Sequence, residues 1–257
     1  DANLVSLVRE YIKSIDGFKS INIIERDKNW GLANNIINGV TSVVNEYGKI
    51  IVLEDDLILS PYYLNFLNNA LNHYKDEKKV WHISGYNLPF DSNGLADTYF
   101  MRLMICSGGW GTWADKWNYF ERNPKKLLEE FSQKDIFHFN LEGARLFWNQ
   151  VKYNVNGKLN TWAIFWYATI YKNEGVCLNP SHSYSRNIGY DSLGTHTKDS
   201  THKDNITISH KEQLVFETEI NESELAVCKL KTYYKTRRRS IITRALSKLK
   251  KLINQSN

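Results

Sequence analysis

The sequence predicts an α/β fold in which a mixed, mainly parallel sheet is flanked by helices. In the first third of the chain, short apolar runs alternate with segments whose apolar residues recur at helical spacing, which is typical of parallel strands joined by helices. An acidic triplet, Glu54-Asp55-Asp56, directly follows one of the apolar runs. Ligands of such sheets bind beyond the carboxyl ends of the strands, so the triplet marks the expected binding edge.

The expected elements follow one another in a regular order. Strands are expected at Ile21–Ile24, Gly48–Leu53, Val80–Ser84, Tyr99–Ile105 and Val176–Pro180. Helices are expected at residues 3–15, 32–46, 141–153 and 160–173, and after Ser60-Pro61, where proline suits the first turn. Residues 107–113 are expected to form a glycine-rich aromatic loop that passes into a helix, and residues 181–212 a long polar loop or lid.

Composition predicts one globular domain with a basic appendage. The chain has 257 residues, of which 42% are hydrophobic and 13% aromatic. Its net charge of +5 is unevenly divided, because residues 228–257 hold ten Lys or Arg and no acid, which leaves 23 basic and 28 acidic residues before them. We therefore expect a domain over residues 1–228 and a tail over 229–257. Three widely spaced cysteines imply no disulfide framework and favour a reducing compartment.

The tail has the pattern of a basic amphipathic helix. Arg244, Lys248 and Lys251 lie opposite a face formed by Ile241, Ile242, Ala245, Leu246, Leu249, Leu252 and Ile253. Such a helix suits an anionic membrane surface, here through residues 237–253, and a solvated helix or an acidic partner is the equal alternative. No apolar run approaches the roughly 20 residues of a membrane span. Nucleic acid is not expected as a partner, because no recognised binding motif accompanies the charge.

The acidic triplet is the strongest candidate for chemistry. Three adjacent carboxylates repel one another, and placing them after a hydrophobic strand is costly without a cation or a donor-rich ligand. Carboxylate and phosphate oxygens are preferred by Mg²⁺ and Mn²⁺, and a bound metal neutralises charge on a departing nucleoside diphosphate. A solvated turn of acids is the alternative interpretation.

A second constellation is Asn29-Trp-Gly-Leu-Ala-Asn-Asn at the start of an expected helix. Gly31 permits tight backbone geometry. Asn34 and its neighbour supply amide groups where a helix N-terminus favours anions. A capped helix start without a ligand is an equally good interpretation.

Four segments in this order resemble bacterial sugar transferases of the GT-A fold. They are Asn29-Trp-Gly-Leu-Ala-Asn-Asn, a strand ending in Leu-Glu-Asp-Asp-Leu, Ser107-Gly-Gly-Trp-Gly-Thr-Trp, and Asn187-Ile-Gly-Tyr-Asp-Ser-Leu-Gly-Thr-His. The chain looks like a glycosyltransferase family 2-like enzyme and is similar to the N-acetylglucosaminyltransferase I family, which shares the Glu-Asp-Asp motif. The resemblance runs to about His196. It implies a GT-A-like (Rossmann-like) fold, and the first strand–helix–strand unit of that fold is expected to be missing here.

The resemblance also implies roles for individual residues. It assigns Asp56 to the metal, Mn²⁺ or Mg²⁺, and His196 to a place near the metal or diphosphate. The donor-binding residues that it implies, together with those inferred from the residues themselves, are Asn29, Gly31, Asn34, Glu54, Asp55, Gly109, Trp110 and Arg186. Trp110 or Trp113 would offer the sugar a stacking face. Arg186 could pair with a phosphate, although a surface arginine is the competing interpretation.

The general base is the open position. An inverting transferase needs a base for the acceptor hydroxyl. Relatives carry an acid just before the tryptophan of a late helix, whereas here Asn160 and Thr161 precede Trp162. Asp191, in the polar segment beside His196, is the substitute candidate for the catalytic base.

The resemblance therefore implies a glycosyltransferase (hexosyltransferase or N-acetylhexosaminyltransferase). It would transfer a sugar from a nucleotide-sugar, usually UDP-linked, with inversion, to a glycan or lipid-linked glycan in surface polysaccharide synthesis. The expected location is cytoplasmic, either free or peripheral on the inner face of the cell membrane. Two alternatives stay open: a nucleotidyltransferase, which also holds Mg²⁺ with acids after a strand, and a catalytically degenerate domain that binds glycans or membranes.

Overall fold

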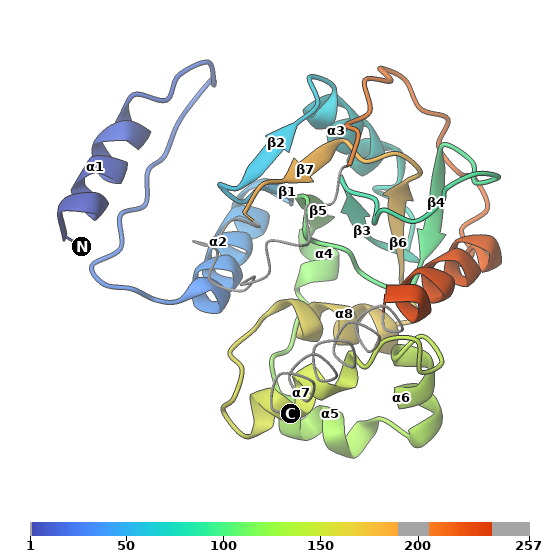
Figure 1. Ribbon diagram of the computed structural model, residues 1–257. Coiled ribbons are helices and arrows are strands. Elements are labelled where there is room, and N and C mark those ends of the chain that lie inside the picture. Colours follow the sequence, from blue (N-terminus) through green and yellow to red (C-terminus); the bar gives the residue numbers. More distant parts are fainter. Residues whose placement is uncertain (1, 190–205, 238–257) are drawn as a thin grey trace, which may run out of the picture.

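The computed structural model describes residues 2–189 and 206–237 (Figure 1). Asp191 and His196 lie outside the described residues, as does the tail from residue 238 onward. The described chain forms a mixed α/β fold with two sheets. The resemblance implies, in addition, that this α/β fold is of the GT-A type.

The main sheet has five strands in the order β1-β5-β3-β6-β4. These strands are β1 (Lys49–Val52), β3 (Val80–Ser84), β4 (Thr98–Met101), β5 (Trp110–Trp113) and β6 (Val176–Pro180). Among the pairings in the described chain only β3 with β6 is parallel, while β1–β5, β3–β5 and β4–β6 are antiparallel. The expectation of a mainly parallel sheet is therefore wrong: the sheet is mixed.

Strand β5 explains this difference. Residues 107–109 form a loop as expected, the glycine-rich loop, but residues 110–113 of the same segment form a strand. This strand runs between β1 and β3, with Val52 opposite Trp110 and Ile83 opposite Gly111. All four β5 residues are buried. Glycine is depleted in strands because it has no side chain to pack, so the sequence conceals this strand. Gly111 suits this position, since a Cβ would lie 3.0 Å from the carbonyl oxygen of Ile50, which is closer than most Cβ contacts.

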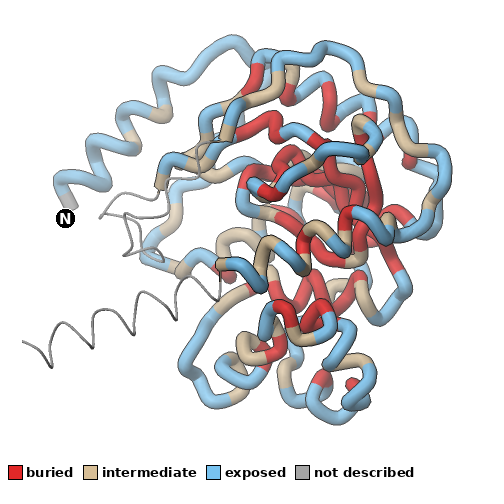
Figure 2. The backbone as a smooth tube through the Cα atoms, turned by 45° about the vertical axis from the view of Figure 1, so that its right-hand side comes forward, coloured by how far each residue is buried: buried red, intermediate tan, exposed pale blue. Residues whose placement is uncertain are grey.

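Helices cover both faces of the sheet, and Figure 2 shows the buried core around it. Helix α3 (Tyr63–His73) packs with Val80, Ile83 and Phe100 in one cluster. Helix α2 (Leu32–Tyr47) and helix α8 (Ala163–Lys172) contribute to the other, larger cluster. The remaining labelled helices of the body are α4 (Ala114–Trp117), α5 (Pro124–Glu130), α6 (Gln133–Phe139) and α7 (Trp148–Val155). Figure 1 shows α5, α6 and α7 gathered below the sheet.

Helix α7 begins later than the helix expected at residues 141–153. Leu141 and Glu142 have φ angles of 50° and 52°, in the left-handed region that a right-handed helix cannot contain. The chain therefore turns at these residues and becomes helical only at Trp148.

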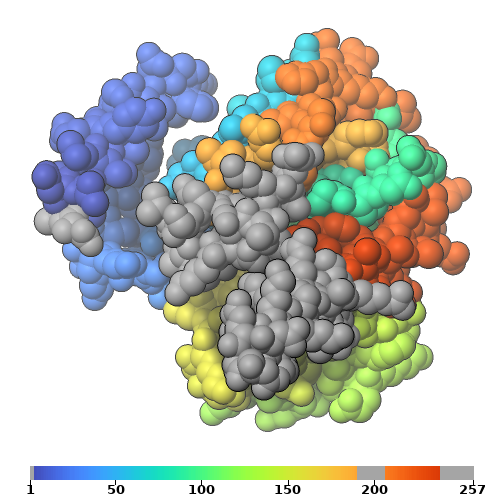
Figure 3. Space-filling model, viewed as in Figure 1, coloured from blue at the N-terminus to red at the C-terminus, as the bar shows by residue number. Residues whose placement is uncertain are grey.

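The first thirty residues form an arm that stands apart from the body (Figures 1 and 3). Helix α1 (Ala2–Lys13) is confirmed, but its apolar side chains are exposed, including Tyr11 at 73%. The buried strand expected at Ile21–Ile24 is wrong, because this segment is irregular and Ile24 is 57% exposed. A strand needs a neighbour for its backbone hydrogen bonds, and the described chain supplies none here.

A two-stranded ribbon connects the acidic triplet to the late part of the chain. Strand β2 (Leu57–Leu59) pairs antiparallel with β7 (Ser185–Asn187), with Leu57 opposite Asn187. β7 lies within the segment expected to be a polar loop, and it brings Asn187 next to the end of the triplet.

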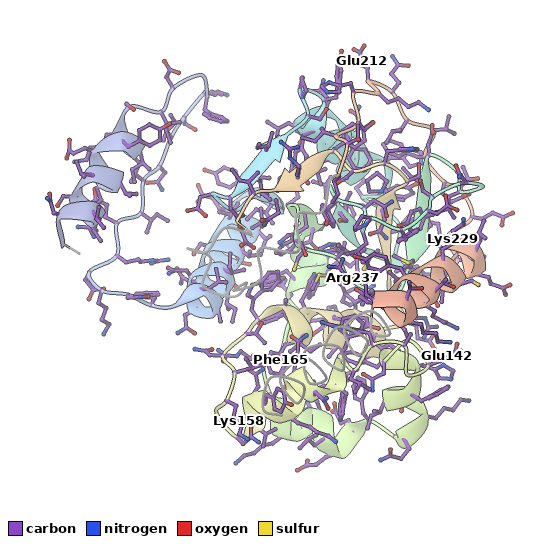
Figure 4. The ribbon with its side chains drawn as sticks, viewed as in Figure 1. Glu142, Lys158, Phe165, Glu212, Lys229 and Arg237 are labelled. Carbon is purple, nitrogen blue, oxygen red and sulfur yellow. The ribbon has the colours of Figure 1, made fainter. Side chains whose placement is uncertain are left out.

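The last described element is a helix over residues 224–237 that packs on the body. Ala226 and Leu230 are fully buried, and Lys231 forms an ion pair with Glu142 at 2.7 Å, in the loop beneath this helix in Figure 4. The domain boundary expected after residue 228 falls inside this helix. None of the described helices is both long and apolar enough to cross a bilayer.

Candidate functional site

The acidic triplet occupies the turn between β1 and β2. Strand β1 ends at Val52, Asp55 and Asp56 form the turn, and β2 begins at Leu57. Glu54 and Asp56 are half-buried, whereas Asp55 is exposed. The triplet therefore presents two carboxylates inward and one to solvent.

Asp56 is held by the segment that follows β7. Its main-chain oxygen accepts a hydrogen bond from the Ile188 N–H at 2.8 Å. Its Oδ2 accepts one from Asn187 Nδ2 at 2.9 Å. Its Oδ1 is buried and has no hydrogen-bond partner among the described residues. A buried carboxylate oxygen without a donor is costly, and a cation at this oxygen removes the cost.

Asn187 is a site residue that sequence reasoning did not single out. Its Oδ1 accepts the Gly189 N–H at 2.8 Å, which turns its Nδ2 toward Asp56. A side chain at Gly189 would collide with the Asp56 carboxylate. The Asn-Ile-Gly run after the polar loop carried a signal, since asparagine and glycine are typical of tight turns beside a strand.

Glu54 has an altered protonation equilibrium. Burial raises the pKa of its carboxyl, and the nearby charges of Asp56 and Asp55 raise it further. The mutual repulsion expected from three adjacent acids is thus present in the folded chain. A cation near Asp56 would act in the opposite direction, because it favours the ionised form.

The glycine-rich loop beside the triplet is held by internal contacts. The Gly108 carbonyl accepts hydrogen bonds from the Tyr63 hydroxyl at 3.1 Å and from Ser185 Oγ at 2.6 Å. Gly109 has a φ of +80°, and a Cβ there would collide with the Tyr63 hydroxyl. The loop is therefore pre-formed, and Gly109 supports its shape through packing.

Trp110 lies in the core instead of facing a ligand. Its side chain is 1% exposed. His82 stacks on the ring with a centroid separation of 5.2 Å, and Trp162 stacks on it with the same separation. Both neighbours belong to the fold, so Trp110 has no face available to a sugar, and the stacking role expected for it is corrected.

The asparagine constellation lies at the start of α2. Asn29 Oδ1 accepts the Gly31 N–H at 2.8 Å, and Asn34 Nδ2 donates to the Trp30 carbonyl at 2.9 Å. Gly31 precedes the helix with a φ of 72°. Because α2 leads through a tight turn into β1, its N-terminus lies toward the end of the sheet where β1 finishes. No hydrogen bond or ion pair of the described residues joins Asn29 or Asn34 to the triplet.

Arg186 lies one residue before Asn187 in β7, opposite Ile58. Successive side chains of a strand point to opposite faces, so Arg186 projects away from the face on which Asn187 meets Asp56. Its side chain is exposed. The structure thus does not bring Arg186 to the acidic site from the same face as Asn187.

The side chains around the triplet show how many protein ligands a metal ion could find there. No group of three or more His, Cys, Asp or Glu side chains gathers in the described part of the chain. At the triplet, the oxygen suited to a cation is the buried Asp56 Oδ1, which has no hydrogen-bond partner among the described residues. A single carboxylate fits a Mg²⁺ or Mn²⁺ that takes its other ligands from phosphates and water, because such ions keep several waters and bind few protein groups.

No protein-family model matches the chain, and no curated protein matches it either.

Proposed function

We propose that the chain is a metal-dependent glycosyltransferase domain that binds a nucleotide-sugar, with UDP as the nucleotide, at the Glu54-Asp55-Asp56 turn. The proposal rests chiefly on Asp56, whose Oδ1 is buried without a partner while its Oδ2 is fixed by Asn187. The location, cytoplasmic and free or peripheral at the membrane, belongs to the same proposal.

The arrangement supports a division of labour. Asp56 holds the metal, Mn²⁺ or Mg²⁺, which when bound offsets the charge of the leaving diphosphate. Asn187 keeps the Asp56 carboxylate oriented, since its amide is locked by the Gly189 N–H. Glu54 and Asp55, at the same turn, face the ribose and the donor sugar. The loop at Gly108 and Gly109 bounds the donor site, because its hydrogen bonds to Tyr63 and Ser185 hold its shape.

The acceptor base is a separate proposal. Asn160, at the position where relatives carry an acid, accepts a hydrogen bond from Arg122 at 2.5 Å, so the described chain presents an amide there. We assign the base to Asp191. In a turnover assay, Asp191→Asn should abolish transfer while leaving UDP binding intact. Unchanged turnover in Asp191→Asn, beside loss in Asp56→Ala, would remove Asp191 from this role.

The same Arg122–Asn160 pair favours a second candidate function. Without an acid before α8, the domain could bind a donor or glycan and perform no transfer. This binding-module alternative predicts a metal-dependent affinity for UDP with no release of UDP from any UDP-sugar.

The decisive experiment measures binding and turnover separately. Thermal unfolding of the chain is followed with UDP alone, Mn²⁺ alone and both together, and UDP release is assayed over a panel of UDP-sugars. Ligand at 100 times its Kd stabilises a folded protein by about 2.7 kcal/mol, a clear rise in melting temperature. Asp56→Ala should lose this rise, and Asp76→Ala, at an exposed acid after α3, should keep it. Absence of both a metal-dependent rise and UDP release would sink the transferase proposal.

A further inference from the structure

An apolar cavity opens beside the glycine-rich loop. It has a volume of about 200 Å³. Its walls come from five separate parts of the chain: Leu88 after β3, residues 103–107, α7 with the residue before it, the first half of α8, and the helix over residues 224–237. The lining residues used below are Met104, Cys106, Ser107, Phe147, Gln150 and Ala163.

The cavity adjoins the acidic site at Ser107. Ser107 lines the cavity, and its carbonyl oxygen lies 3.5 Å from Asn187 Nδ2, the same amide that donates to Asp56 Oδ2 at 2.9 Å. Its neighbour Cys106 also lines the cavity and feels the charge of Glu54. A molecule held at the triplet would therefore reach the cavity past Ser107, through a group attached close to its reacting atom.

The cavity walls are mainly apolar. Its lining in the described chain includes no Asp, Glu, Lys or Arg. The Tyr167 hydroxyl donates a hydrogen bond to the carbonyl oxygen of Phe139 at 3.1 Å. Gln150 supplies the main polar side chain, at the edge given by α7. Sugar hydroxyls placed here would lose their water without gaining partners, which is costly, whereas buried methylene groups are stabilised.

We infer that this cavity binds a hydrocarbon chain attached directly to the acceptor sugar. The inference rests on the proposed function and narrows its acceptor to an amphiphile, a sugar that carries an alkyl or acyl chain. The sugar lies at the acidic turn, and the chain passes Ser107 and Cys106 into the space between α7 and α8. A purely polar glycan would leave the cavity unfilled.

The test uses n-alkyl β-D-glucosides from methyl to octyl, kept below their micelle concentrations, as probes for the chain-binding cavity. Calorimetric titration of the full chain gives Kd for each length. Burial of each methylene should lower Kd about fourfold until the cavity is full. Gln150→Phe, which fills the cavity from α7, should abolish this gain. Lys152→Phe, on the same helix but exposed and outside the lining, should retain it.

The opposite results are equally definite. A Kd independent of chain length overturns the inference, and so does a gain that survives in Gln150→Phe, because the chain then binds elsewhere. Melting curves establish that each variant folds. If Gln150→Phe does not fold, Ala163→Leu fills the same space from the start of α8 and decides the question.

Failure of this inference is distinguishable from failure of the transferase proposal. Metal-dependent UDP binding with no chain-length gain overturns the cavity assignment alone. A chain-length gain in a protein that neither binds UDP with Mn²⁺ nor releases UDP overturns the transferase proposal, and with it the acceptor role of the cavity.

Discussion

The indole N–H of Trp166 donates to Nδ1 of His82 at 3.3 Å. Nδ1 is thus an acceptor, so the proton of the neutral ring lies on Nε2, which donates to the Ile105 carbonyl at 3.0 Å. Trp110 stacks on the same ring. His82 is fully buried and burial lowers its pKa from 6.5 to about 4. This histidine is a neutral core residue that packs β3 against Trp110, the first residue of β5 after the glycine-rich loop.

This pair predicts acid sensitivity of the fold. Because the pKa of His82 is lower in the folded state than in the unfolded state, only the unfolded chain takes up its proton as the pH falls from 6.5 toward 4. Above pH 6.5 the neutral ring imposes no such loss on the free energy of unfolding. As the pH falls toward 4, the free energy of unfolding decreases by at most about 3 kcal/mol. Urea unfolding across this range measures it. His82→Gln, which can keep both hydrogen bonds, should flatten the slope; an unchanged slope contradicts the assignment.

The partnerless oxygen of Asp56 predicts a trade between stability and binding. Asp56→Asn removes a buried charge that has no donor at Oδ1, so the metal-free protein should become more stable by about 1 kcal/mol. The same variant should lose the rise in melting temperature that UDP with Mn²⁺ gives to the unaltered chain. A metal-free protein that is strongly destabilised would show that Asp56 has a donor in solution.

Asn187 should matter for binding more than for folding. Asn187→Ala removes the donor to Asp56 Oδ2 and frees the carboxylate to rotate. We expect the affinity for UDP with Mn²⁺ to fall about tenfold, in line with other residues that orient a metal ligand. Asn68→Ala is the control, because Asn68 is an exposed residue of α3 that bonds only its own helix. Equal affinities of the two variants would exclude the orienting role.

Gly109 predicts a measurable packing cost. Gly109→Ala combines a positive φ of +80° with a collision against the Tyr63 hydroxyl, and should destabilise the chain by about 3 kcal/mol. Gly94→Ala has a similar φ of +83° but only an ordinary contact, 3.6 Å from Leu225. It should cost about 1 kcal/mol. Chemical denaturation of both variants isolates the collision, and equal losses would contradict it.

Periodicity predicted the fold where local pattern and burial agree. The expected strand at Val80–Ser84 matches β3 residue for residue, and α2 follows its expected helix closely. β5 was not predicted because Trp110–Trp113 contains a glycine and reads as a loop. Its pairing with β1 and β3 depends on residues far away in the sequence, so residue spacing does not predict it. Both pairings are antiparallel, which makes the sheet mixed.

The candidate site was predicted in part. The turn at Asp55 and Asp56 follows from the strand before it, and the structure places it at the end of β1. Asn187 was not singled out, because the pairing that brings it to Asp56 spans 131 residues. Trp110 was misjudged for the opposite reason: an aromatic in a glycine-rich run suits both a ligand and a core, and only its neighbours His82 and Trp162 decide.

The separation of the N-terminal arm has a consequence for handling the protein. Between α1 and α2 the backbone is irregular and exposed, and its anchors to α2 are the hydrogen bonds of Arg26 to Asn35 and Asn38. A protease that cleaves after lysine should cut first in this segment, at Lys19 or Lys28. The larger fragment should keep almost the whole cooperative unfolding transition. It should also remain in solution at concentrations where the intact chain, which exposes the apolar residues of α1, begins to self-associate.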